Sequence, residues 1–135
     1  MPQSKLLPSC GITSRTRSGV STYRQRDIAL VPFPFSDLSA SKVRPVFILS
    51  NDEHNQQSAD VVVCGLTTNL EPSPYSVPVA PADVEQAGTL RHKSKIKADA
   101  ISFLDQSLII KPIARLKLSV FRQVVREIER LIEPP

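Results

Sequence analysis

At 135 residues, with two cysteines far apart in sequence (Cys10 and Cys64), the chain is expected to fold as one domain that depends on neither a disulfide framework nor a zinc site. No stretch approaches the ~20 consecutive apolar residues of a membrane-spanning helix, so we expect a soluble, cytoplasmic protein that acts away from membranes. The net charge of +4 comes from the N-terminal end: residues 1–26 carry five basic residues and no acid, whereas residues 27–135 hold 12 Lys and Arg against 13 Asp and Glu.

The first 22 residues are rich in Ser, Thr, Arg, Gly and Pro and show neither helical nor alternating apolar periodicity. We predict a disordered leader at 1–22 and a folded domain at 23–135. The acid-free, Arg-rich composition also resembles an organellar transit peptide. A third interpretation is that the natural protein lacks this leader and starts near Val20, a residue that a GTG codon can encode.

Between residues 27 and 113 the sequence contains short apolar runs of strand length, separated by polar turns. They cover residues 27–35, 44–50, 60–66, 75–80, 96–105 and 107–113. The two prolines of the first run belong at a strand edge or a strand end, because proline cannot donate to a ladder. The β-branched third run predicts a central strand and the fourth an edge strand. The last two runs are expected to form a pair joined tightly near Gln106.

The end of the chain has the one-faced apolar spacing of a helix, at residues 121, 124, 125, 128, 131 and 132. Ser119 is the expected N-cap and Pro134 the stop. Several short strands followed by one helix predict a mainly β protein with a C-terminal helix, an α+β chain whose core is a small SH3-like antiparallel β-barrel.

Arg44 stands at the mouth of the buried run RPVFILS (44–50). A guanidinium is always charged and carries five donors in a fork that fits a phosphate or a carboxylate. It is therefore either aimed at an anionic ligand or paired on the surface with an acid such as Asp37 or Asp52.

Thr67, Thr68 and Asn69 follow directly on the next buried run, VVVCGL. If the two runs are neighbouring strands, their ends can bring a hydroxyl and the Arg44 guanidinium to one phosphate. The alternative is an ordinary strand-end turn, because Thr and Asn bond to their own backbone there.

A third basic feature is the acid-free run RHKSKIK at 91–97, which includes Arg91, Lys93 and Lys95. Such a run is either a solvated face or a phosphate track that gives salt-dependent affinity. His92 can titrate near neutrality but is as readily a solvated loop residue. We expect no metal site and no cofactor, since two separated histidines without a carboxylate cluster make no ligand set.

Three segments carry a family resemblance: RDIALVPFPFSDLSASKVRPVFILSND (26–52), DVVVCGLTTNL (60–70) and KIKADAISFLDQSLIIKPIARL (95–116), followed by the closing helix. In this order, over about residues 26 to 132, they resemble the MazF/PemK family of toxin endoribonucleases from bacterial type II toxin–antitoxin pairs. The most specific parts are the DI…VPFPFSDLS…RPVFILS block and the apolar strand that ends in LTT.

The resemblance implies an SH3-like barrel, usually a homodimer, that binds single-stranded RNA between subunits and is neutralised by an antitoxin protein. It implies Arg44 and Thr67 as catalytic residues of a metal-independent, sequence-selective cleavage of mRNA that leaves a 2′,3′-cyclic phosphate and a 5′-hydroxyl and arrests growth. Ser36 and Lys42 of the polar loop 36–42, together with Thr68, Asn69, Arg91, Lys93 and Lys95, are the expected RNA contacts. By residue type, the proton of the 2′-hydroxyl could go to His54, His92 or Asp52.

The sequence departs from the family pattern in three places. Arg26 and Ala114 stand where the family usually has glycine, and the leader is extra. Two other functions remain open from sequence: a gyrase-binding toxin of the same fold that cleaves nothing, and a degenerate toxin that only binds its antitoxin.

Overall fold

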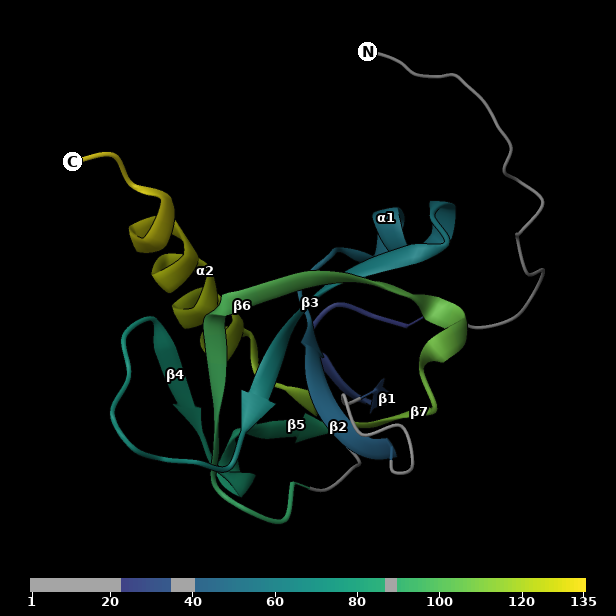
Figure 1. The fold of residues 1–135 in the computed structure, drawn as a ribbon, viewed down its shortest axis with the longest axis horizontal. Coiled ribbons are helices and arrows are strands. Elements are labelled where there is room, and N and C mark those ends of the chain that lie inside the picture. Colours follow the sequence, from purple (N-terminus) through teal and green to yellow (C-terminus); the bar gives the residue numbers. More distant parts are fainter. Residues whose placement is uncertain (1–22, 35–40, 87–89) are drawn as a thin grey trace.

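Figure 1 shows the fold in a computed structural model, which describes residues 23–34, 41–86 and 90–135. The predicted leader (1–22) and most of the polar loop 36–42, Ser36 included, lie outside these residues. The part of the domain that the structure describes therefore starts at Tyr23.

The strands form one antiparallel sheet in the order β4-β6-β3-β2-β1-β7-β5. Its two outer strands, β4 and β5, are consecutive in the chain and are joined through the short 3₁₀ turn Pro81–Asp83. Because so short a connection links the two edges, the sheet has to curl, and Figure 1 shows it as a half-open barrel. The strands are β1 (Asp27–Pro34), β2 (Ser41–Ile48), β3 (Asp60–Thr67), β4 (Ser76–Val79), β5 (Val84–Gln86), β6 (Ser94–Asp105) and β7 (Lys111–Leu116).

Two helices complete the described chain: α1 (Asp52–Gln57) after β2, and α2 (Leu118–Ile132) at the C-terminus. Helix α2 packs against β4 and β6. It buries Val120 and Val124, and the rings of Phe47 and Phe121 lie 6.3 Å apart between centroids. The expected mainly β class with a C-terminal helix is confirmed.

The predicted N-cap of the C-terminal helix is wrong. The helix begins at Leu118, and its N-cap is Lys117, whose side chain makes no capping hydrogen bond. The Lys117 backbone N–H donates to the Asp83 carbonyl at 3.0 Å, which holds the residue against the turn before β5. This tertiary contact, rather than the Ser119 hydroxyl, sets the start of the helix.

The other strand predictions mostly agree with the structure. The run at 60–66 is β3, an interior strand, and the run at 75–80 contains the edge strand β4. Pro34 ends β1, as a proline can. The pairing of β1 with β7 stops at Leu30. Pro32 lies beyond that point and is paired only with β2 among the described strands, so its missing backbone N–H costs no hydrogen bond to β7.

The predicted pair at 96–105 and 107–113 is wrong. Strand β6 pairs with β3 and β4, whereas β7 pairs with β1 and β5. The chain is redirected at Gln106, a buried residue whose Nε2 donates to the carbonyls of Asn55 (2.8 Å) and Ser58 (2.9 Å). The Ile110 N–H then donates to the Leu30 carbonyl at 2.8 Å, so the chain continues beside β1.

The sheet packs apolar residues on both faces. Phe47, Cys64 and Leu66 belong to the larger cluster, which α2 covers. Val31, Val46 and Val63 belong to a second cluster on the other face. None of the helices in the described part of the chain is long and apolar enough to cross a membrane.

Candidate functional site

Strands β2 and β3 are neighbours over part of their length and then separate. Their ladder pairs Ile48 with Val63 and Val46 with Gly65, and its register ends there. Beyond this point β2 continues beside β1, and β3 continues beside β6. Pro45 precedes the ladder and has no backbone N–H to offer. The lower ends of the two strands diverge in Figure 1, so the sheet is split at this end.

Arg44 and Thr67 stand on the two sides of this split. Each lies two residues beyond the last β2–β3 pair, Val46 with Gly65. Since side chains alternate along a strand, Arg44 shares the face of Val46 and Thr67 shares the face of Gly65. Arg44 is exposed, and half-buried Thr67 is the last residue of β3. The fold therefore sets a guanidinium and a hydroxyl on the same face of the sheet, across one opening.

The Thr67 side chain also takes part in the turn that sequence reasoning held as the alternative. Its Oγ1 accepts a hydrogen bond from the Asn69 N–H at 3.1 Å, and Asn69 Oδ1 accepts from the Glu71 N–H at 3.0 Å. An oxygen that accepts one bond still has its own proton to donate. The turn thus orients the Thr67 hydroxyl without using up its donor.

Of the two acids considered as partners of Arg44, the structure places one, Asp52, at a distance from it. Asp52 lies past the other end of β2, where its carboxylate accepts from the Gln25 N–H (2.9 Å) and lies 3.6 Å from the Arg24 guanidinium. Asp37 lies outside the described residues.

Lys95 is placed differently from an ordinary surface lysine. It pairs with Thr67 of β3 on one side and with Pro78 of β4 on the other. The residue is only 7% exposed, and its ammonium donates to the Glu71 carbonyl and to Ser73 Oγ, the latter at 2.7 Å. Lys95 therefore ties the β3–β4 connection to β6. Its direct contact with RNA stays a prediction.

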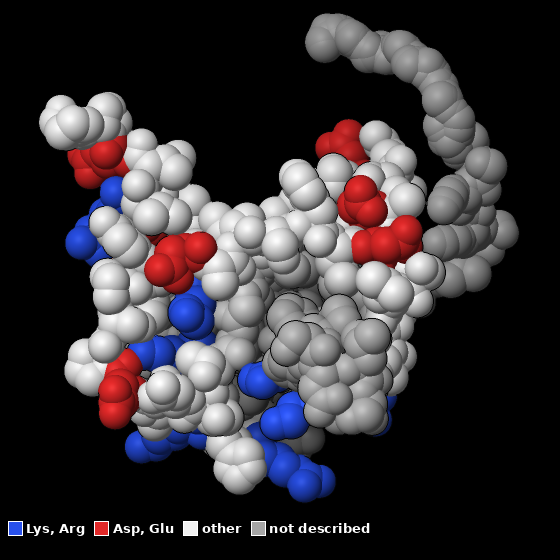
Figure 2. Space-filling model, in the orientation of Figure 1, with Lys and Arg blue, Asp and Glu red and all other residues white. Residues whose placement is uncertain are grey.

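The remaining predicted RNA contacts that the structure describes lie at this same end of the sheet. Lys42 is in β2, Thr68 and Asn69 follow β3, and Arg91 and Lys93 precede β6; all five are exposed. Figure 2 shows several Lys and Arg at the lower end of the molecule, below β2 and β3; others lie on the side of α2, and Asp and Glu appear both around α1 and on the side of α2. The basic residues thus flank the split.

The structure separates the three residues considered as proton acceptors. Asp52 and His54 are in α1, which follows β2, whereas Arg44 is near the start of that strand. The four residue steps from Arg44 to Ile48 alone span about 13 Å. His92 instead lies two residues before β6 begins, at the end of the sheet that holds Thr67. Of these three, His92 is the one at the candidate site.

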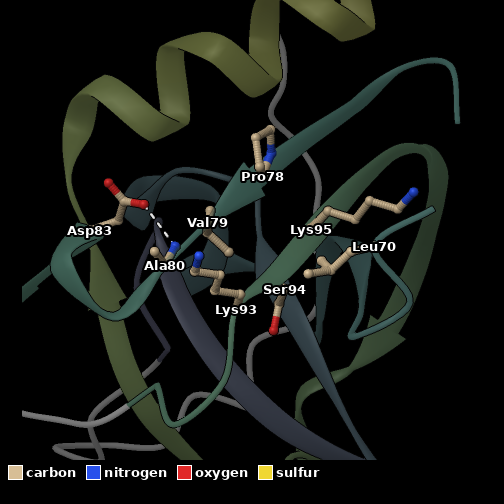
Figure 3. A pocket seen from close by; sticks show the side chains of 8 residues that line it. All are labelled: Leu70, Pro78, Val79, Ala80, Asp83, Lys93, Ser94 and Lys95. Carbon is tan, nitrogen blue, oxygen red and sulfur yellow. Dashed lines mark hydrogen bonds between the residues drawn. The ribbon is translucent and has the colours of Figure 1, made fainter. Parts of the chain in front are cut away.

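Sequence reasoning missed a pocket of about 430 Å³ beside the site. Its lining residues are Leu70, Pro78, Val79, Ala80, Asp83, Lys93, Ser94 and Lys95 (Figure 3). An apolar residue directly after the polar run TTN was the one available signal, and Leu70 is 51% exposed in the structure. The other lining residues come together only through the sheet order.

This curled sheet with a C-terminal helix is the fold of solved bacterial toxins. The chain superposes on an endoribonuclease in complex with its cognate antitoxin from a mycobacterial species (TM-score 0.67, 18% identity, covering 84% of this chain and 97% of that one). It superposes equally on MazF from Deinococcus radiodurans (TM-score 0.67, 18% identity, 85% and 100% covered). A MazE–MazF structure from the same organism gives a TM-score of 0.66 at 15% identity, with 86% and 100% covered.

At such identities, these likenesses establish the fold. The sequence establishes the family: residues 24–132 match the model of the PemK-like, MazF-like toxins of type II toxin–antitoxin systems. The chain belongs to this family. No curated protein sequence matches it closely enough to serve as a relative.

Proposed function

We propose that the chain is a sequence-selective endoribonuclease that cleaves single-stranded mRNA in the cytoplasm without a metal. The ribose 2′-hydroxyl gives up its proton and attacks the adjacent phosphorus, and the bond from phosphorus to the 5′ oxygen breaks. One product ends in a 2′,3′-cyclic phosphate, and the other takes up a proton to end in a 5′-hydroxyl. The nucleophile belongs to the substrate, so the protein has to bind and stabilise a phosphate whose charge rises.

The arrangement of Arg44 and Thr67 across the split is the observation that carries this proposal. An arginine fork can bind both nonbridging oxygens as negative charge develops on the phosphate, and a hydroxyl can add another hydrogen bond. The basic residues around the split supply sequence-independent attraction for the rest of the strand. The matching family and the fold of solved endoribonucleases give further support.

An antitoxin is the second partner that we propose. The mycobacterial endoribonuclease of the same fold is solved with its cognate antitoxin, and the D. radiodurans structure pairs MazE with MazF. A protein that covers the split of this chain would block RNA from Arg44 and Thr67.

We also propose a homodimer, in which a second copy covers the C-terminal part of β6, residues 98–105. Strand β4 pairs with β6 up to Lys97, so in the described sheet the later residues of β6 have β3 alone as a neighbour. Phe103, in this part of the strand, is 77% exposed, and Ile101 is 41% exposed. An apolar edge of this kind is normally covered, and two antiparallel edges can pair symmetrically about a two-fold axis.

The decisive experiment is cleavage of a long single-stranded RNA by the purified protein in EDTA, with the cut sites and end groups mapped. We expect discrete cuts that end in cyclic phosphate. Arg44→Ala should lower the rate by about 10²- to 10³-fold, the usual cost of losing a main oxyanion donor. The matched control is Arg122→Ala, which removes an exposed arginine of α2.

Full activity of Arg44→Ala would remove Arg44 from the mechanism. Intact RNA with the unmodified protein would contradict cleavage altogether and direct the next assay to gyrase supercoiling.

A further inference from the structure

The pocket beside the split has the character of a ligand site. Its volume, about 430 Å³, is within the range of small-molecule sites in proteins. Leu70, Pro78 and Val79 give it apolar walls, and Lys93 and Lys95 supply basic groups. Figure 3 shows Asp83 and Lys95 at opposite ends of the lining, with Val79 and Lys93 between them. The lining thus combines apolar walls with two basic residues, and its one acid lies at the end away from Lys95.

The sheet register connects this pocket to the split. Lys95 is paired with Thr67 across the β3–β6 ladder and with Pro78 across the β4–β6 ladder. Neighbouring strands lie about 4.8 Å apart. A ligand group in the pocket is therefore one or two strands away from Thr67. If an RNA phosphate lies at the split, the base of the neighbouring nucleotide can extend into the pocket.

Lys95 also fixes the shape of the pocket. Its ammonium holds the Glu71 carbonyl and Ser73 Oγ, so the β3–β4 connection is fastened to β6. Leu70, which forms the wall nearest Thr67 in sequence, belongs to this connection. The wall is therefore held in place before any ligand binds, which lowers the ordering cost of binding.

The distribution of charge indicates what the pocket takes. Asp83 closes one end, where its Oδ2 accepts from the Ala80 N–H at 2.8 Å. A carboxylate there repels a phosphate but not a neutral, flat group. Exposed Arg91 and Lys93 stand on the segment that enters β6, where they can hold a phosphate. A polyanion that carries neutral apolar rings, such as single-stranded RNA, matches both properties.

We propose that this pocket binds one base of the RNA, that of a nucleotide adjacent to the scissile phosphate, and so contributes to the sequence preference of cleavage; this proposal rests on the proposed nuclease function. Leu70 is the base-contacting residue, and Lys95 is a positioning residue that acts through the β3–β4 connection.

The test maps the cut motif of three proteins on a random-sequence RNA pool in EDTA: the unmodified chain, Leu70→Ala, and Leu131→Ala as a control that truncates an exposed leucine of α2. Loss of one apolar base contact should relax the preference at a single position next to the cut by about tenfold. Lys95→Met should relax the same position, and Lys95→Arg should restore part of it. The Leu131→Ala motif should match that of the unmodified chain.

Two results in this assay would overturn the proposal: an unchanged motif in Leu70→Ala, or a uniform loss of rate at every sequence. A second assay keeps the two proposals separate, namely binding of a labelled 2′-O-methyl RNA pool, which lacks the nucleophile. If the unmodified chain binds this pool selectively but cuts no RNA, the nuclease proposal fails, while a relaxed preference in Leu70→Ala still supports the pocket. Absence of binding, or the same selectivity in both proteins, rejects the pocket.

Discussion

Thr67 of β3 and Lys95 of β6 are paired residues, and this pairing joins the two halves of the candidate site. On one side of Thr67, the sheet splits and Arg44 stands across the opening. On the other side, Lys95 holds the connection that carries Leu70. The proposed phosphate-binding groups and the pocket therefore lie in one row, which runs from Arg44 of β2 across the split to Thr67 of β3 and Lys95 of β6. A change at Thr67 should act on chemistry, whereas a change at Lys95 should act on selectivity.

The hydroxyl of Thr67 should matter more than that of its neighbour. Thr67→Val removes the hydroxyl at nearly constant shape, so we expect the cleavage rate to fall about 10- to 100-fold, less than for Arg44→Ala, because a neutral donor stabilises charge less than a guanidinium does. Loss of the acceptor for the Asn69 N–H should also lower stability by about 1 kcal/mol. Single-turnover cleavage and urea unfolding measure the two effects.

Thr68→Val is the matched control, because it makes the same chemical change at the next, exposed residue. Its cleavage rate should stay within a few-fold of that of the unmodified protein. If Thr68→Val proves the more damaging variant, the catalytic hydroxyl belongs to Thr68 and the predicted register is wrong by one residue.

The exposed edge of β6 should determine the oligomeric state. Phe103→Glu places a charge where the proposed dimer would bury an aromatic ring, so the species in solution should shift from twice the chain mass of 14.9 kDa to a single chain. Light scattering behind a sizing column gives the mass directly. Leu118→Glu, at an exposed leucine at the start of α2, should leave the dimer intact. A Phe103→Glu protein that stays dimeric would place the interface elsewhere.

Much of the sheet was predictable because its signals are local. The β-branched run at 61–63 has to be covered on both faces, and β3 is an interior strand. The short run at 75–80, interrupted by proline, was predicted as an edge strand, and β4 is an edge, although β1, β2 and β7 also contain proline and lie inside the sheet. The helix is encoded in its apolar spacing: Val124 is buried, and Phe121 and Ile128 pack against the core, whereas buried Val120 was not among the predicted positions. Each of these follows from a few neighbouring residues.

The errors concern contacts between distant segments. The predicted hairpin near Gln106 failed because the Gln106 amide bonds to Asn55 and Ser58, a contact that no local pattern encodes. In the sequence, Lys95 is one of five basic residues in the run 91–97, and nothing marks it as buried. In the structure it is buried, and its hydrogen-bond partners, Glu71 and Ser73, lie more than 20 residues away in the chain. Arg44 and Thr67 could be named in advance, but their placement across a split depends on where the β2–β3 ladder ends.

Arg26 should be strained where it stands. Its φ of 78° lies in the left-handed region, which costs an ordinary residue about 1 kcal/mol and glycine almost nothing. Its guanidinium compensates by donating to the Leu116 carbonyl (3.0 Å) and to Glu85 (3.2 Å). Arg26→Gly and Arg26→Ala both lose these bonds, but only the alanine keeps the strain. The glycine variant should therefore be more stable than the alanine variant by about 1 kcal/mol in urea unfolding.

The same pair of substitutions at Arg24, a neighbouring exposed residue, serves as the control. Glycine there should be the less stable of the two, because it gains unfolded-state entropy without relieving any strain. If alanine is also the more stable variant at position 26, the left-handed backbone there costs less than the unfolded-state entropy that glycine adds.

Cys64 should make the fold sensitive to alkaline pH. Burial, aided by the negative charge of Asp99, raises the pKa of the Cys64 thiol from 9.0 to about 12. The folded chain thus holds a proton that the unfolded chain releases above pH 9, so this contribution to stability is complete below pH 9 and is lost as the pH rises toward 12.

In a Cys10→Ser background, the free energy of unfolding should fall between pH 8 and pH 10 by about 1 kcal/mol more than in the same protein carrying Cys64→Ala. The alanine variant starts from a lower stability because it leaves a small cavity, so the comparison lies in the slopes and not in the values at one pH. Parallel slopes in the two proteins would mean that the thiol ionises as easily in the folded chain as in the unfolded one.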